Sequence, residues 1–180
     1  MKPLFPFGHG LSYTTFSLLD MTASQKSGDR SNITNETLEI SVFVENNGSR
    51  SGSETAQVYV SPPPTSRIMR PTRELKGFKK VKLEPGEKRE VTVSIPLSLA
   101  TSYWDENRSA WLSEAGEYTA TVVGTGKGNT VSQTFTLGRT RWWNGLPHPA
   151  VNDVSTSVDG TGAHVNGNGS LSCNGNGKHC

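Results

Sequence analysis

The sequence predicts an all-β protein, a seven-stranded β-sandwich followed by a disordered C-terminal tail. Apolar and polar residues alternate with period two in several runs between residues 11 and 138, which is typical of strands with one buried face. Glycine, proline and asparagine separate these runs at the spacing of a sandwich, and no stretch carries a convincing helical period. A lone pair of strands is marginal in water, so their apolar faces need a second layer.

The chain opens with a linker at residues 1–10, where prolines and glycines interrupt any regular element. Leu4, Phe5 and Phe7 in this linker are apolar, and we expect them to be buried against another surface. The first strand is predicted at residues 11–21, where β-favouring and apolar side chains are frequent.

A polar loop at residues 22–36 leads to the clearest strand, at residues 37–46. Its apolar residues fall on one predicted face and comprise Leu38, Ile40, Val42 and Val44. The third strand is predicted at residues 56–60, and the run of prolines at 62–64 ends it because proline cannot donate a hydrogen bond to a sheet ladder.

Residues 75–95 predict two antiparallel strands joined as a hairpin at Pro85 and Gly86. Proline presets the first central position of a type II turn, and glycine tolerates the positive φ of the second. Both flanking strands have one apolar face, formed by Val81 and Leu83 before the turn and by Val91, Val93 and Ile95 after it.

Residues 97–114 hold three aromatic residues among polar ones, and we expect an irregular crossover there rather than a strand. The last two strands are predicted at 118–122 and 131–137, on either side of a glycine-rich turn. The predicted domain thus spans residues 11–138.

The C-terminal part is predicted in two segments. Residues 139–149 carry the adjacent pair Trp142 and Trp143 and are expected to pack on the domain or on a neighbour. Residues 150–180 hold scarcely any apolar residue, so they cannot offset the entropy lost on ordering and are predicted to be disordered. Both cysteines, Cys173 and Cys180, lie in this tail, where a disulfide between them stays open.

Composition disfavours several classes of partner. The net charge is only +2 and the basic residues are spread along the chain, so no nucleic-acid partner is expected. No apolar run approaches the roughly 18 residues of a membrane span, so no membrane partner is expected. The N-terminus lacks the uninterrupted apolar run of a signal peptide, so either the protein is cytoplasmic or the chain is a piece of a longer protein. We expect the second.

No motif assigns a cofactor, a metal or a catalytic residue to this chain. The four histidines show no metal-ligand spacing, and neither a phosphate-binding loop nor a nucleophile elbow is present. Asp105 and Glu106 beside Trp104 are the carboxylates that could suggest sugar hydrolysis. Adjacent residues point in different directions, however, so a structural role for them is favoured.

The tryptophans Trp104, Trp111, Trp142 and Trp143 allow two interpretations. Exposed aromatic residues more often mark an interface, which favours Trp142 and Trp143 packing on a neighbouring domain. The alternative is a non-catalytic module whose rings bind polysaccharide or another surface. N-glycosylation sequons begin at Asn32, Asn35, Asn47, Asn107 and Asn168.

Three stretches resemble the C-terminal end of family 3 glycoside hydrolases, and fungal β-glucosidases most of all. They are PLFPFGHGLSYTTF at 3–16, RPTRELKGFKKVKLEPGEKREVTVSIPL at 70–97 and SYWDENRSAWLSEAGEYTATVVG at 102–124. The resemblance covers about residues 3–146. It implies a fibronectin type III-like domain, an immunoglobulin-like sandwich that follows a (β/α)8 barrel and an α/β sandwich domain.

The resemblance also implies what the complete enzyme does. That enzyme hydrolyses terminal non-reducing β-D-glucosyl residues with retention, by a double displacement on two carboxylates. The family's nucleophile, an aspartate of the barrel, and its acid/base, a glutamate of the following domain, match no position of this chain. We therefore expect an accessory domain that is inactive alone and has the catalytic domains as its partner. The sequons and the family together favour secretion, with a cytoplasmic location as the alternative.

Overall fold

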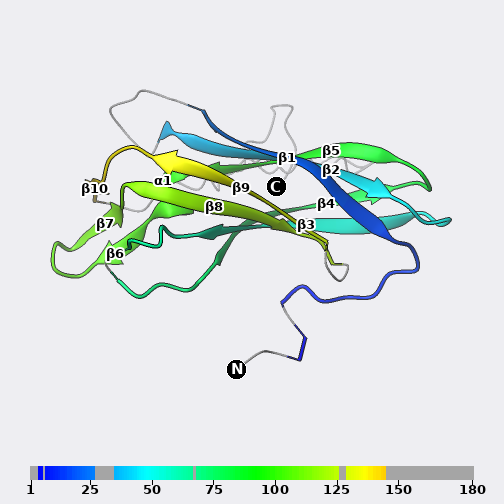
Figure 1. Cartoon of the computed structure of the whole chain (residues 1–180), viewed down its shortest axis with the longest axis horizontal. Helices are drawn as coiled ribbons and strands as arrows, with labels where there is room; N and C mark the ends of the chain where they lie inside the picture. The colour runs from blue at the N-terminus through cyan, green and yellow to red at the C-terminus, as the bar shows by residue number, and fades with distance from the viewer. Residues whose placement is uncertain (1–3, 6, 27–34, 67, 126–128, 145–180) are drawn as a thin grey trace, which may run out of the picture. The chain divides into compact units, whose positions relative to one another are not determined.

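A computed structural model describes residues 4–5, 7–26, 35–66, 68–125 and 129–144 (Figure 1). More than half of these residues are in strands, and the described part of the chain has a single short helix. In chain order the elements are β1 (Phe16–Lys26), β2 (Thr37–Asn46), β3 (Gly52–Ser61), β4 (Glu74–Leu83), β5 (Lys88–Pro96), α1 (Leu97–Thr101), β6 (Tyr103–Asp105), β7 (Ala110–Ser113), β8 (Gly116–Val123), β9 (Thr130–Leu137) and β10 (Arg141–Trp143). The predicted tail at 150–180 lies outside the described residues.

Seven strands form the predicted sandwich. One layer has the order β1-β2-β5 and the other has the order β4-β3-β8-β9, and every pairing is antiparallel. Figure 1 shows the two sheets stacked face to face. The all-β prediction and its seven sandwich strands are confirmed.

The core is the apolar layer between these two sheets. The predicted inward face of β2 is confirmed, since its four aliphatic residues are all at most 1% exposed. The fully or nearly fully buried members from the two sheets include Leu38, Ile40, Val42, Val44, Ala56, Val58, Val60, Leu83, Val91, Ile95, Tyr118, Ala120, Val122 and Leu137. Burial of this apolar surface holds the layers together.

The predicted hairpin at 75–95 is wrong in its pairing. β4 pairs with β3 in the four-stranded sheet, whereas β5 pairs with β2 in the three-stranded sheet. The chain therefore crosses from one layer to the other at Pro85 and Gly86, and the two apolar faces meet across the core. The turn itself is as predicted, because Glu87 N donates to Glu84 O at 3.0 Å and Gly86 has φ +74°.

The first strand begins and ends five residues later than predicted, at Phe16–Lys26. A bulge between Leu19 and Thr22 shifts its register against β2, and Asp20 there has φ +50°. The inward residues are even-numbered before the bulge, as at Leu18, and odd-numbered after it, as at the half-buried Ala23. The alternation therefore changes phase at the bulge, and the sequence pattern does not reveal the second half of the strand.

The predicted irregular crossover at 97–114 is also wrong. It contains the five-residue helix α1 and the strands β6 and β7, which pair with each other. β10 joins β7 on its other side and completes a small sheet of order β10-β7-β6 at one end of the sandwich (Figure 1). Strands of three or four residues are too short to show a period in the sequence.

Candidate functional site

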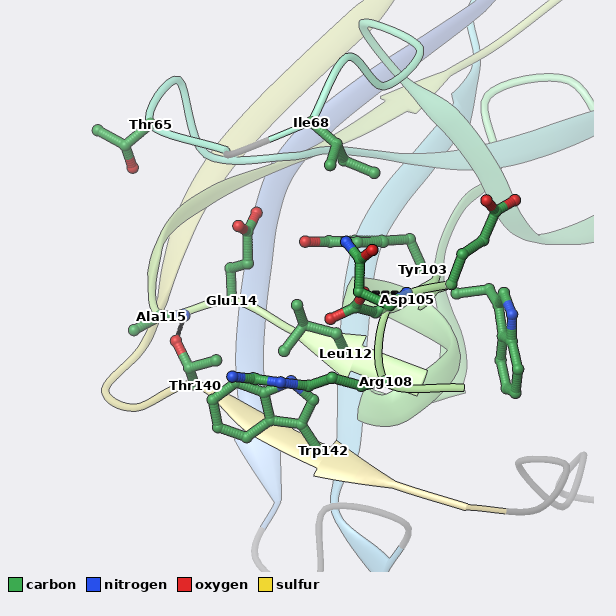
Figure 2. Close-up of a pocket in the computed structure, with 13 residues that line it drawn as sticks. Thr65, Ile68, Tyr103, Asp105, Arg108, Leu112, Glu114, Ala115, Thr140 and Trp142 are labelled. Atoms are coloured by element: carbon green, nitrogen blue, oxygen red, sulfur yellow. Dashed lines mark hydrogen bonds between the residues drawn. The ribbon is translucent and has the colours of Figure 1, made fainter. Parts of the chain in front are cut away.

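The small sheet forms the floor of an open groove with a volume of about 850 Å³. Its strands place Tyr103, Leu112 and Trp142 directly opposite one another, so these side chains share one face of the sheet. Figure 2 shows them beneath the loop that carries Thr65 and Ile68. The groove thus joins segments that lie far apart in the sequence.

Trp142 and Trp143 do not form one platform. Successive residues of a strand point to opposite faces, and here Trp142 lines the groove at 45% exposure while Trp143 packs against the core. The indole N–H of Trp143 is buried and has no hydrogen-bond partner among the described residues. The guanidinium of the exposed Arg108 lies 4.5 Å from the ring centroid of Trp142. Figure 2 shows the two side chains next to each other.

Glu114 is a buried carboxylate in the groove wall. Its Oε2 accepts a hydrogen bond of 2.6 Å from Ser66 Oγ, and its backbone carbonyl accepts one of 2.9 Å from Tyr118 Oη. Burial raises the pKa of Tyr103. The negative charge of Glu114 and the side-chain hydrogen bond between Tyr103 and Glu114 raise that pKa further. The Tyr103 hydroxyl therefore stays protonated and holds its place beside Glu114.

Arg70 stabilises this wall through its contacts with Tyr103 and Thr101. It lies 5.2 Å from the ring centroid of Tyr103, and its Nη1 donates to Thr101 O at 3.0 Å. Its Nη2 pairs with Glu74 Oε1 at 2.9 Å, and Lys76 Nζ pairs with Glu74 Oε2 at 2.8 Å. Partial burial raises the pKa of Glu74, but hydrogen bonds and charge from Lys76 and Arg70 outweigh it and leave the pKa below its usual value.

Asp105 and Glu106, the carboxylates considered from the sequence, both line the groove. Asp105 is half-buried and its Oδ1 accepts a hydrogen bond of 3.1 Å from Asn107 N, which fixes the β6–β7 turn. Glu106 is exposed. Sequence reasoning found these two, Trp104 and Trp142, but missed Glu114, Tyr103 and Arg108 as site residues, because only the tertiary fold brings them together.

The predicted interface residues of the entry segment are strongly exposed, at 88% for Leu4, 64% for Phe5 and 76% for Phe7. The backbone of Gly8, with φ +79°, passes so close to Gln57 of β3 that a Cβ would lie 2.1 Å from its Nε2. Gly8 therefore lies against the outer face of the four-stranded sheet.

That outer face carries further exposed apolar side chains. Phe78 of β4 lies directly opposite Gln57 and is 68% exposed, and Leu75 lies opposite Tyr59 and is 40% exposed. We call the exposed residues Leu4, Phe5, Phe7, Leu75 and Phe78 the outer patch. Exposed apolar residues gathered in this way mark interaction surfaces.

Three of the sequon asparagines lie on the surface: Asn35, Asn47 and Asn107 are all exposed. Asn107 sits in the β6–β7 turn and lines the groove. Asn32, Asn168 and the two cysteines lie outside the described residues.

Two searches of the described residues were negative. No group of three His, Cys, Asp or Glu side chains among them could hold a metal ion. No helix in the described part of the chain is long and apolar enough to cross a membrane.

Comparison with protein families agrees with the sandwich. Residues 54–125, from β3 to the end of β8, match the family model of the fibronectin type III-like domain. Together with the two packed antiparallel sheets, this match shows that the chain contains a fibronectin type III-like domain.

The chain is similar to part of several curated β-glucosidases. It is 52% identical over 145 residues to probable beta-glucosidase J of Aspergillus fumigatus, a match that covers 80% of this chain and 17% of that protein. It is 47% identical over 146 residues to probable beta-glucosidase I of Neosartorya fischeri, covering 81% of this chain and 17% of the relative. The chain therefore spans about one sixth of the length of these relatives.

Solved structures give the same result. The β-glucosidase of Kluyveromyces marxianus in complex with glucose has a TM-score of 0.69 and 43% identity, over 81% of this chain and 16% of that one. β-Glucosidase 3B of Thermotoga neapolitana in complex with glucose has a TM-score of 0.66 and 38% identity, over 80% of this chain and 19% of that one. The sequence-based resemblance to a domain of β-glucosidases is confirmed.

Proposed function

We propose that the chain is the accessory fibronectin type III-like domain of a family 3 β-glucosidase. The observation that carries this proposal is the match of four fifths of the chain to only one sixth of β-glucosidases. The hydrolysis of terminal β-D-glucosyl residues then belongs to catalytic domains outside this chain. The domain contributes a surface on which those domains pack.

The outer patch is the docking surface in this proposal. Its aromatic side chains are largely exposed, at 64% for Phe5, 76% for Phe7 and 68% for Phe78. Burying each of them against another domain removes apolar area from water. Its occupant is a catalytic domain of the same enzyme, since Gly8, next to Phe7 in the entry segment, lies against the same sheet.

The first prediction concerns activity and stability together. The purified chain releases no nitrophenol from p-nitrophenyl β-D-glucopyranoside. In a full-length β-glucosidase that carries this domain, Phe78→Lys lowers the melting temperature of the enzyme by several degrees, because it places a charge in the interface.

The matched control is Thr22→Lys, which adds the same charge at an exposed position on the other sheet. In the isolated chain both variants melt as the unmodified protein does, since neither residue is in the core. Turnover by the isolated chain, or equal effects of the two variants in the full enzyme, contradicts the proposal.

We also propose that the protein is secreted and N-glycosylated. Asn35, Asn47 and Asn107 are exposed sequon asparagines, which supports glycan attachment. The second prediction is that protein secreted from a fungal host loses mass on treatment with peptide-N-glycosidase. An unchanged mass, or a product found only in the cytoplasm, argues against this proposal.

A further inference from the structure

We propose that the groove on the β10-β7-β6 sheet is a binding site for a neutral pyranoside, with Trp142 as the stacking residue. The inference goes beyond the proposed function, because docking on a catalytic domain uses the outer patch and needs no ligand in the groove. It rests on the aromatic floor, the polar groups around it and the way in which they are fixed.

The floor offers a flat apolar surface of the size of a sugar ring. Tyr103, Leu112 and Trp142 stand in one row across three strands, and the indole of Trp142 is 45% exposed. A pyranose with equatorial hydroxyls has an apolar face of C–H groups that packs against such a ring, while its hydroxyls remain at the edge.

The rim offers both acceptors and donors. The carboxylates of Asp105, Glu106 and Glu114 accept hydrogen bonds, and the amide of Asn107 and the guanidinium of Arg108 donate them. Sugar hydroxyls do both, so a polyhydroxylated ring satisfies more of these groups than an apolar ligand does.

The charges disfavour anionic ligands. Three carboxylates and one guanidinium line the groove, which leaves the lining with an excess of negative charge. Trp142 already has a cation over its ring in Arg108, so a cationic ligand has to compete with a tethered side chain for that position. A neutral ring is not repelled by the carboxylates as an anion is, and it is not repelled by the displaced guanidinium of Arg108 as a cation is.

The site is fixed before any ligand arrives. Glu114 is held by Ser66, Asp105 by the backbone of Asn107, and Thr140 Oγ1 accepts a 2.9 Å hydrogen bond from Ala115 N. These contacts, two of which are drawn in Figure 2, hold the walls in place, so little ordering entropy remains to be lost on binding.

Arg108 is the movable part of the site. Its side chain is exposed, and a surface cation–π contact is weak enough for a ligand to displace. We infer that the ligand stacks on Trp142 in its place and that the released guanidinium donates to the ligand's hydroxyls.

The test is a titration of the full chain, labelled with ¹⁵N, with cellobiose and with methyl β-D-glucopyranoside. The indole N–H resonance of Trp142, identified as the one missing in Trp142→Phe, shifts and saturates, while that of Trp143, whose indole N–H is buried, does not. Sorbitol, which has the hydroxyls without the ring, and spermidine, a cationic probe, give no saturable shift.

The variants then separate stacking from general damage. Trp142→Ala weakens cellobiose binding at least about tenfold, Trp142→Phe by less because a smaller ring remains, and Phe78→Ala on the distant β4 not at all. No saturable shift with either sugar overturns the proposal, as does an equal response to sorbitol, a preference for spermidine or equal losses in Trp142→Ala and Phe78→Ala. Since Phe78 reports docking and Trp142 reports the groove, either proposal can fail alone.

Discussion

Asn46 is a fully buried polar residue at the end of β2, and its amide joins four segments. Thr14 Oγ1 donates to its Oδ1 at 2.6 Å, and Gly48 N donates to the same atom at 3.1 Å. Its Nδ2 donates to Arg50 O at 2.8 Å and to Leu83 O at 3.2 Å. Every donor and acceptor of the amide is thus used, so its burial costs little.

Replacement of Asn46 by alanine is expected to lower the free energy of unfolding by about 2–4 kcal/mol, because the buried carbonyl of Leu83 loses a donor and a cavity forms. Urea denaturation of the chain measures the change. Asn47→Ala is the control, since Asn47 is exposed and its side-chain Nδ2 donates to Ser17 Oγ at the surface, and its effect stays below about 1 kcal/mol. Similar losses in both variants contradict the role assigned to Asn46.

The burial of Asn46 could be read from the sequence, but its contacts could not. Asn46 continues the alternation of Leu38, Ile40, Val42 and Val44, and the period therefore places it on the inward face. Glu54 behaves in the same way on β3, where it is 1% exposed and its carboxylate accepts hydrogen bonds from Thr125. At these two positions the alternation of the strand predicts burial correctly, whereas the polarity of the side chain predicts exposure.

At the scale of elements, the crossing from β4 to β5 is the main departure from the predicted topology. Alternation tells which side chains face inward, but both a hairpin and a crossing between sheets give the same pattern. The hydrogen bonds of the turn favour the crossing over the hairpin. Gly86 N donates to Asn46 O at 2.9 Å, and Asn46 N donates to Glu87 O at 3.0 Å. These bonds attach the turn to the end of β2 in the other layer.

The turn gives a prediction about Gly86. Its φ of +74° is in the left-handed region, and no atom lies within 4 Å of a Cβ placed there, so only backbone strain opposes a side chain. Gly86→Ala is expected to destabilise the chain by about 1–2 kcal/mol in urea denaturation.

Gly138→Ala is the matched control. Its Cβ would also meet no atom within 4 Å, and its backbone is not in the left-handed region. Alanine there is expected to leave stability unchanged or to raise it slightly, because it restricts the unfolded chain. Destabilisation of the same size at both positions would show that conformation at Gly86 is not the cause.

At the scale of the whole molecule, the sequence predicted the layers and the core but not the groove. The sandwich follows from strands of 8 to 11 residues whose period is visible. The groove depends on three strands of three or four residues and on a loop some 40 residues earlier, which no local pattern connects. The different roles of Trp142 and Trp143 could not be predicted for the same reason. The pairing of β10 with β7 determines which of the two side chains faces the groove and which faces the core.

β4 has a further consequence as one of the two edge strands of its sheet. An unpaired edge is a template on which another chain can add a strand, but this one carries Lys79, Lys80 and Lys82, all exposed. Two molecules that approached edge to edge would bring two rows of ammonium groups together. The strand that limits the sheet thus also opposes polymerisation through it, and dissolved salt weakens that electrostatic barrier.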